Sequence, residues 1–291
     1  MTTPSQWRRV NRANPCPVCQ RFDWCAVATD GAVALCQRVE SPRRIGEAGW
    51  LHRLKNIPWR SQGRCIRRIP LTESGSMDME RLADEFQQAV DPGRLHQLAV
   101  SLGLSVASLC QLGVGWSADH RAWSFPMTDA GGAVLGVRLR RPNGVKFAVK
   151  GGREGLFLPA TAGEKLSPLY ICEGPTDTAA LLQIGFSNVA GRPSCTGGIK
   201  LLVELVRRRF VSEVVILADG DEPGRRGADN LASVLVAYVP AARVVAPPQG
   251  VKDARDWLRA GAGRPEVEAA IQAASVRRLS INAAAIIGSK R

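Results

Sequence analysis

Residues 169–174 (LYICEG) and residues 214–221 (VVILADGD) are the two stretches that decide the fold of this chain. In each, a short run that is apolar on both faces ends in acidic residues, and a helical pattern follows. Such runs are typical of buried parallel strands in an α/β sheet. Ligands bind at the carboxyl ends of strands of this kind. We therefore expect Glu173, Asp219 and Asp221 to meet at one edge of a parallel sheet.

Three carboxylates at one sheet edge repel each other unless a cation lies among them. Mg²⁺ is the natural occupant, because it is a hard ion that prefers oxygen ligands and phosphate partners. The pattern therefore predicts metal-dependent chemistry on a phosphate. The alternative interpretation is that these acids only cap two αβ turns, which are rich in Asp and Gly.

The same residues resemble the TOPRIM domain, which bacterial and phage primases share with some topoisomerases and nucleases. That family has a Glu after one strand and Asp-x-Asp after a later one. Residues 249–258 (QGVKDARDWL) resemble the Gly-x-Lys/Glu-Asp-x-x-Asp segment that closes the domain in bacterial DNA primases of the DnaG type. The resemblance covers roughly residues 167–261.

The resemblance implies a Rossmann-like parallel sheet and a set of catalytic residues. Glu173, Asp219 and Asp221 would be the catalytic acids and would bind catalytic Mg²⁺ or Mn²⁺, and Glu173 is also the candidate general acid or base. Asp253 and Asp256 would complete the metal cluster, and Lys252 would bind nucleotide or neutralise the acids.

Positive charge gathers at the two ends of the 291-residue chain, whose formal net charge is +13. Residues 1–70 carry a net charge of +9, residues 71–276 of zero, and the last 15 residues of +4. A basic, Arg-rich front segment suits a polyanion such as nucleic acid, although charge that serves only solubility is the alternative. The sequence has no apolar run long enough for a membrane span and no secretory signal, so we expect a cytoplasmic protein without a membrane partner.

Four cysteines near the amino terminus have the spacing of a metal site. They follow the pattern C-x₂-C-x₅-C-x₁₀-C, and the sequence predicts that they bind a structural Zn²⁺ tetrahedrally: Cys16, Cys19, Cys25 and Cys36. Residues 29–31 (TDG) indicate a tight turn between two short strands, which together predict a zinc ribbon. A redox Cys-x-x-Cys or unligated thiols are the alternatives, and His52 and Cys65 are possible substitute ligands.

The middle of the chain combines irregular, helical and hairpin patterns. Residues 37–76 indicate an irregular linker, and residues 77–90 and 94–110 indicate helices. Residues 134–140 and 146–150 alternate around an RPNG turn, which predicts a hairpin. Four hairpin cations share a face if the register aligns them: Arg138, Arg140, Lys146 and Lys150. By resemblance to the primase core, they would hold template and nucleotide phosphates, whereas a solvated outer face is the alternative.

A zinc ribbon ahead of a TOPRIM domain is the arrangement of bacterial and phage primases. We therefore expect an α/β chain with an amino-terminal zinc ribbon and basic linker (1–70), a basic α+β part of a primase core (71–165), a TOPRIM catalytic domain (166–262), and a carboxyl-terminal helix with a basic tail (263–291). The distal ligands Cys25 and Cys36 depart from the usual second Cys-x₂-Cys pair, which leaves template reading by this ribbon open.

The resulting hypothesis is a DNA primase-like enzyme that synthesises short RNA on single-stranded DNA from ribonucleoside triphosphates and takes part in DNA replication. The chain has no Walker A sequence, so a replicative helicase would act in trans. Two alternatives remain. One is a non-catalytic adaptor resembling the bacterial recombination mediator, which also pairs a four-Cys zinc site with a TOPRIM domain. The other is a TOPRIM nuclease.

Overall fold

The computed structural model describes residues 7–45, 49–54, 78–160 and 168–280. The chain divides into two compact units, Met1–Thr72 and Glu73–Arg291. Within the described ranges, no helix combines the length and the apolar character needed to cross a membrane.

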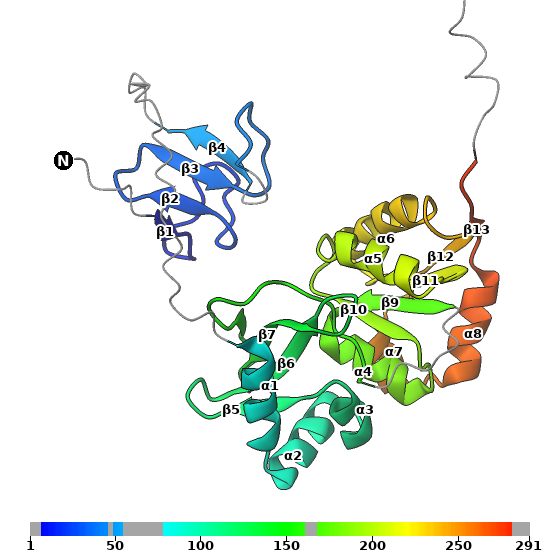
Figure 1. Ribbon diagram of the computed structural model, residues 1–291. Coiled ribbons are helices and arrows are strands. Elements are labelled where there is room, and N and C mark those ends of the chain that lie inside the picture. The colour runs from blue at the N-terminus through cyan, green and yellow to red at the C-terminus, as the bar shows by residue number, and fades with distance from the viewer. Residues whose placement is uncertain (1–6, 46–48, 55–77, 161–167, 281–291) are drawn as a thin grey trace, which may run out of the picture. The chain divides into compact units, whose positions relative to one another are not determined.

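The first unit is a small antiparallel sheet (Figure 1). Its buried cluster consists of three of the four cysteines and Val10, and Cys19 packs against it. Its strands pair in chain order and are β1 (Trp7–Arg9), β2 (Ala26–Ala28), β3 (Val33–Cys36) and β4 (Trp50–Arg53). The turn predicted from residues 29–31 joins β2 to β3, and Gly31 takes the positive φ of +67° that such a turn needs.

One prediction for this region is wrong. Residues 37–76 were expected to be irregular, but β4 lies within them and pairs with β3, Trp50 opposite Cys36. A strand of four residues carries too little periodicity to be seen in the sequence, and its pairing with β3 is what orders it. Cys65 lies outside the described residues.

The second unit contains a parallel sheet with helices on both faces. Its strands lie in the order β10-β9-β11-β12-β13, and only β13 is antiparallel. Their bounds are β9 Leu169–Glu173, β10 Val189–Arg192, β11 Glu213–Leu217, β12 Ala241–Val245 and β13 Val276–Arg277. The two predicted buried strands are thus neighbours in the sheet. Sequence patterning missed β13, a two-residue edge strand in the segment expected to be a tail.

Five helices cover this sheet, and Figure 1 shows them in two layers. The bounds are α4 Gly174–Ile184, α5 Ile199–Arg208, α6 Glu222–Leu235, α7 Ala254–Arg259 and α8 Arg264–Ala273. Helices α5 and α6 pack through leucines such as Leu205 and Leu231 on one face of the sheet. Helices α4, α7 and α8 pack on the other, where Trp257 and Val267 meet the strands. The result is an α/β/α sandwich, and the Rossmann-like parallel sheet predicted for this region is confirmed.

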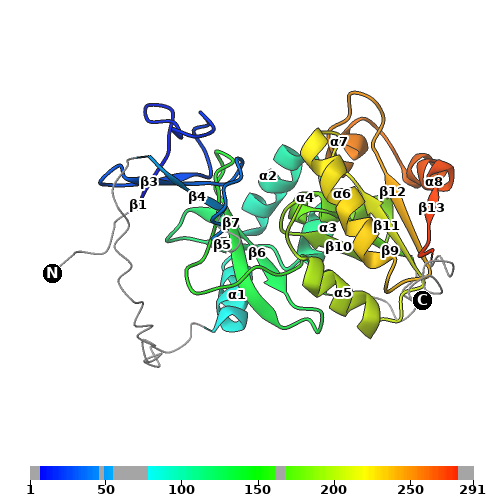
Figure 2. The ribbon, with the colours of Figure 1, turned by 90° about the horizontal axis from the view of Figure 1, so that it is seen from above.

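A second sheet precedes the sandwich and pairs as a meander. Its strands are β5 Gly115–Ser117, β6 Ala122–Thr128, β7 Val134–Arg140 and β8 Lys146–Ala148, so the predicted hairpin is confirmed as β7–β8. Three helices accompany it: α1 Met79–Gln88, α2 Pro92–Leu102 and α3 Val106–Gln111. Helix α1 packs on one face, and α2 and α3 pack on the other together with α4 (Figure 2).

The helix expected over residues 94–110 is two helices. Gly103 ends α2 in the left-handed conformation, with φ +68°, and Ser105 then caps α3 by accepting a hydrogen bond from the Ser108 amide at 3.1 Å. The bend directs α3 onto α4, because it places Leu109 in the core shared with Ala179 and Ala180. The β5–β8 sheet is therefore joined to the α/β/α sandwich by a common core.

Candidate active site and zinc centre

Glu173 stands where β9 ends and α4 begins. It is the N-cap residue of α4, and Gly174 after it has φ +78°, a conformation that glycine adopts without strain. The sharp turn leaves the Glu173 carboxyl at the sheet edge, where the backbone N–H of Cys195 donates a hydrogen bond to it. Burial raises the pKa of Glu173, while the positive charges of Arg192 and Lys146 act in the opposite direction.

Arg192 is the neighbour of Glu173 across the parallel pair β9–β10. Its side chain is only 3% exposed. It donates hydrogen bonds to the carbonyl oxygens of Gly227, at 3.2 Å, and of Cys195. Arg192 therefore fixes the loop after β10 against α6 and places one positive charge beside the acids.

The loop after β11 carries two more acids, Asp219 and Asp221. The Asp221 side chain accepts a hydrogen bond from the Gly224 amide at 2.8 Å and so caps α6. The Gly220 amide donates to the Lys252 carbonyl at 2.5 Å, which ties this loop to the segment that leads into α7. The sequence segments around Asp219 and Asp253 are thereby held together.

Two further carboxylates meet at the start of α7. Asp253 accepts a hydrogen bond from the Asp256 amide at 2.8 Å, and Asp177, on α4, accepts one from the Arg255 amide at 3.0 Å. Asp177 is 7% exposed and Asp253 is 6% exposed. Burial raises the pKa of Asp177 well above its usual value, and the Asp253 charge adds to that rise.

Among the acids of this edge, Asp219 is the one whose pKa is raised by three neighbouring carboxylates. The pKa of Asp219 is raised to about 7, most of all by burial and also by the charges of Glu173, Asp253 and Asp221, whereas the charge of Lys252 opposes the rise. Asp219 thus lies in a field of negative charge. Such a field favours a cation or a proton at this edge of the sheet.

Cations from the second sheet face these acids across a cleft of about 290 Å³. Arg140 and Lys146 are directly opposite each other on β7 and β8, and Arg138 lies two residues from Arg140 on the same face. All three line the cleft together with Glu173, Asp177, Asp219, Lys252, Asp253 and Arg255. Burial lowers the pKa of Lys146, and the charge of Arg140 lowers it as well.

Three predicted site residues do not line this cleft. Lys150 follows β8 in a turn, because the strand ends at Ala148. Asp256 lies in the first turn of α7 and contacts Arg259 at 4.0 Å. Asp221 acts on Asp219 and Glu173 only through its charge.

The acidic edge suits Mg²⁺ in one particular way. Among the described residues, the carboxylate oxygens form no group of three within 4.8 Å of one another. Mg²⁺ usually keeps several waters and takes one or two carboxylates together with substrate phosphates. The carboxylates of Glu173 and Asp219, which lie in one cleft with the cations Arg138, Arg140 and Lys146, fit that mode of binding.

The four cysteines of the first unit form a compact group. Their sulfur atoms all lie within 4.8 Å of one another, and three of the four residues are buried. The Sγ–Sγ distance is 3.7 Å between Cys19 and Cys25 and 4.0 Å between Cys25 and Cys36. A tetrahedron with Zn–S bonds of about 2.3 Å has edges of about 3.8 Å, so the cluster fits Zn²⁺. His52 is directed elsewhere, since its Nε2 lies 2.9 Å from the Val39 carbonyl oxygen.

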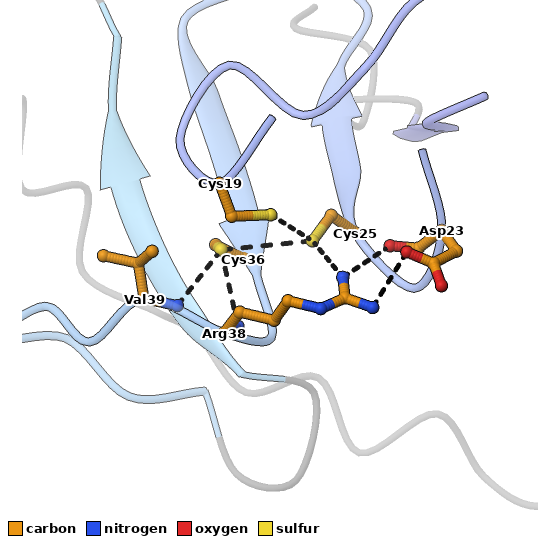
Figure 3. A network of polar contacts seen from close by, with 6 residues as sticks. All are labelled: Cys19, Asp23, Cys25, Cys36, Arg38 and Val39. Atoms are coloured by element: carbon orange, nitrogen blue, oxygen red, sulfur yellow. Dashed lines mark hydrogen bonds and ion pairs between the residues drawn. The ribbon is translucent and has the colours of Figure 1, made fainter. Parts of the chain in front are cut away.

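Hydrogen-bond donors surround the sulfurs, as Figure 3 shows. The amides of Arg38 and Val39 donate to Cys36 Sγ at 3.4 and 3.3 Å. The Arg38 guanidinium lies 3.9 Å from Cys25 Sγ and is held by Asp23 at 2.8 Å. The pKa of Cys25 is raised to about 12, chiefly by burial and also by the neighbouring thiols of Cys19 and Cys16. Four thiolates therefore need a cation among them, and the donors are arranged to stabilise their charge.

Sequence reasoning missed several residues of the cleft. Asp177 lies four residues after Glu173, a spacing that places both on one side of a helix start, and this signal was available. Arg255, on α7, and Arg192, which pairs with Glu173 beside the cleft, gave no signal, because in the sequence such an arginine looks like any surface arginine.

Comparison with known proteins supports the resemblance found in the sequence. The Toprim-like family model matches residues 170–258, so the TOPRIM assignment of this segment is confirmed. The matched segment begins in β9 and ends in α7, and it contains all four acids that line the cleft. No match was found among curated proteins.

Solved structures share the fold of most of the chain. A DnaG primase catalytic domain bound to single-stranded DNA has 18% sequence identity and a TM-score of 0.56, over 68% of this chain and 78% of that one. The zinc-binding and RNA polymerase domains of the Aquifex aeolicus primase have 18% identity and a TM-score of 0.58, over 69% and 60%. The Escherichia coli primase catalytic core has 18% identity and a TM-score of 0.51, over 68% and 79%. At this identity the likeness shows a primase-like fold.

Proposed function

We propose that this chain is a primase-like nucleotidyltransferase that makes short RNA on single-stranded DNA from ribonucleoside triphosphates. One observation carries the proposal. The strand-end acids of a Toprim-like sheet and three cations of a second sheet line the same cleft, and the two sheets share one core. Such a cleft suits a substrate that carries both phosphates and bound metal ions.

In this proposal, the basic side of the cleft binds phosphates and the acidic side takes part in the chemical step. Arg138, Arg140 and Lys146 bind the template backbone and the nucleotide phosphates, which form charge-assisted hydrogen bonds with them. The 3′-hydroxyl of the growing RNA attacks the α-phosphorus of the incoming nucleotide, and pyrophosphate leaves. Glu173 accepts the hydroxyl proton, and its raised pKa brings it nearer to neutral pH, where a general base works best.

Glu173, Asp219 and Asp221 would hold catalytic Mg²⁺ or Mn²⁺, with Asp253 beside them. When bound, the metal polarises the phosphoryl oxygens and neutralises developing charge. Lys252 lies 3.9 Å from Asp253 and limits the negative charge at this edge. In the same proposal, the four cysteines bind a structural Zn²⁺ and the basic first unit binds the template strand.

The test is primer synthesis on single-stranded DNA with labelled ribonucleotides and Mg²⁺ or Mn²⁺. The wild-type chain should yield short RNA. Asp219→Asn should lower the yield by at least about a hundredfold, because it removes a carboxylate from the metal-binding edge. Asp229→Asn is the matched control, since it makes the same change on an exposed part of α6, and it should retain activity.

Two results would contradict the proposal in different ways. Full activity of Asp219→Asn would show that the metal-binding edge is wrongly assigned. No product from the wild-type chain, with salt-sensitive binding to single-stranded DNA intact, would favour the non-catalytic adaptor instead.

A further inference from the structure

Exposed apolar side chains of the second unit gather at the edge of the parallel sheet opposite the catalytic one. Among the described residues of this unit, six large apolar side chains are exposed, and three of these six lie beside β11, β12 and β13: Phe210, Tyr238 and Leu279. Their exposed fractions are 91%, 48% and 57%. Single exposed apolar residues are normal on a protein surface, whereas several together at one place indicate contact with another molecule.

The register of the sheet brings these three residues to adjacent segments. The first residues of β11 and β12 are paired, and Phe210 and Tyr238 each come three residues before their own strand. Strand β13 is antiparallel to β12, so the chain leaves it towards the same edge, where Leu279 follows two residues later. Two strand spacings of about 4.8 Å make this edge about 10 Å wide. That width suits an extended peptide segment or the face of one helix.

Phe210 occupies a backbone position that its side chain does not favour. It follows the C-cap residue of α5 and has a φ of +48°, in the left-handed region where glycine is the usual residue. The Val211 amide donates to the Val206 carbonyl at 3.1 Å. The Phe210 amide donates to the Arg207 carbonyl at 3.5 Å, which completes the two bonds of a Schellman motif. Val206 and Val211 are buried whereas Phe210 is left in solvent, so neither backbone geometry nor core packing accounts for a phenylalanine here.

The same edge is positively charged. Five arginines and no acidic residue lie in its three segments, residues 207–212, 236–240 and 276–280. Two of the arginines, Arg208 and Arg277, pair with acids of α5 and α6. Arg207 and Arg278 are exposed, and within the described part of the chain no carboxylate lies within 4.0 Å of either guanidinium group. An apolar centre with unpaired arginines beside it has the composition of a binding surface for an acidic partner.

We infer that this edge of the sheet docks an acidic segment of a partner protein, whose apolar side chains pack on Phe210 and whose carboxylates pair with Arg207 and Arg278. Charge complementarity carries the choice of partner. A nucleic acid is less suited, because the aliphatic Leu279 offers a base no aromatic face to stack on. The inference stands apart from the proposed function, since this edge and the catalytic cleft lie at opposite ends of the same strands.

Two occupants from the chain itself suit the edge less well. A second copy would present the same surface across a two-fold axis, so that arginines would face arginines. Residues 281–291, which follow this edge in the sequence and lie outside the described residues, contain Lys290 and Arg291 and no acid. Both alternatives lack the negative charge that complements this edge, and each has its own arm in the test.

The test is a selection of random dodecapeptides, displayed on phage, on the immobilised full chain in the presence of oligothymidylate, which competes for the cationic cleft. Enriched peptides should combine acidic and apolar residues. The most enriched peptide, labelled with fluorescein, then gives Kd by anisotropy. Phe210→Gly should raise this Kd by at least about tenfold, because it removes the central apolar contact. Arg207→Gln with Arg278→Gln should raise it by about threefold and reduce its salt dependence.

Stability measurements separate a docking role from a folding role. Phe210→Gly relieves the left-handed backbone position, so the Tm of the second unit should rise by about 2–4 °C while peptide binding is lost. A side chain kept for folding would lower the Tm when it is removed. Val100→Ala removes another exposed apolar side chain, on α2, and should leave Kd unchanged. Arg81→Gln with Arg121→Gln removes the same charge from α1 and the β5–β6 turn and should also leave it unchanged.

The outcomes distinguish the possible occupants. Peptides without acids, or an unchanged Kd in Phe210→Gly, would overturn the inference. Weaker oligothymidylate binding by Phe210→Gly would assign the edge to nucleic acid instead. A wild-type dimer in sedimentation that Phe210→Gly abolishes would assign it to a second copy, and peptide binding that appears only in a chain ending at Ser280 would assign it to residues 281–291. Loss of peptide binding by Phe210→Gly with retained primer synthesis would support the inference and leave the proposed function standing.

Discussion

At the scale of single residues, Asp219 is the group whose properties depend most on its surroundings. An isolated aspartate ionises near 3.8, and the folded protein raises the pKa of Asp219 to about 7 through burial and three neighbouring acids. Because the folded form holds its proton up to a higher pH than the unfolded chain does, stability falls as the pH rises from about 4 to about 7 and then levels off.

Asp219→Asn should therefore stabilise the protein in buffer without added Mg²⁺. The increase in the free energy of unfolding should be absent near pH 4. It should reach about 1–2 kcal/mol above pH 7, after allowance for the partial exposure of the Asp219 side chain. Thermal or urea unfolding across this pH range measures it. Asp229→Asn serves as the control and should show no such rise with pH, and a flat difference for Asp219→Asn would contradict the proposed acidic field.

At the scale of elements, the register of the β7–β8 hairpin places basic residues that alternate in the sequence on one face of the sheet. Period-two alternation predicts that Arg138 and Arg140 share a face, and the register adds Lys146 directly opposite Arg140. The sequence could not exclude Lys150, because only the observed end of β8 at Ala148 places it in a turn. The cationic wall of the cleft is therefore three residues of the predicted four.

Neutralising this wall should weaken nucleic-acid binding. The double variant Arg138→Gln, Arg140→Gln should lower the salt slope of single-strand binding by about 1.4, since about 0.7 is lost for each phosphate contact. Anisotropy titrations at several salt concentrations measure the slope. Arg207→Gln with Arg208→Gln removes the same charge from α5, and an equal loss in that control would show that net charge alone governs binding.

At the scale of the whole molecule, the chain consists of two compact units with different sources of stability. The second unit has extensive apolar cores on both faces of its large sheet. Among the described residues of the first unit, few side chains are buried besides the cysteines, so in the proposed zinc ribbon the metal would supply most of the folding free energy.

Cys16→Ser should release zinc and unfold the first unit while the second keeps its own unfolding transition. The first unit should lose most of its free energy of unfolding, because structural zinc contributes on the order of 10 kcal/mol to the folding of such small domains. Zinc content and hydrogen exchange resolved by segment measure both effects. Cys110→Ser, an exposed cysteine on α3, is the control. A wild-type chain without zinc, or a Cys16→Ser chain that retains it, would contradict the assignment.

Local patterns in the sequence are enough to predict the acids of the sheet edge and the class of fold. Apolar runs ending in Glu173 and in Asp219–Asp221 identify parallel strands, because patterning and strand-end acids are local properties. The cysteine spacing identifies a cluster for the same reason. These features lie within short stretches, and no long-range contact is needed to see them.

Which of these groups share a cleft depends on how the chain folds. Asp177 and Arg192 come to Glu173 through α4 and β10, and Lys146 lies opposite Arg140 only once β7 and β8 take their register. The strands β4 and β13 likewise exist through pairing with β3 and β12. Burial, register and the energy of like charges at close range depend on contacts between distant segments, which a pattern along the chain does not contain.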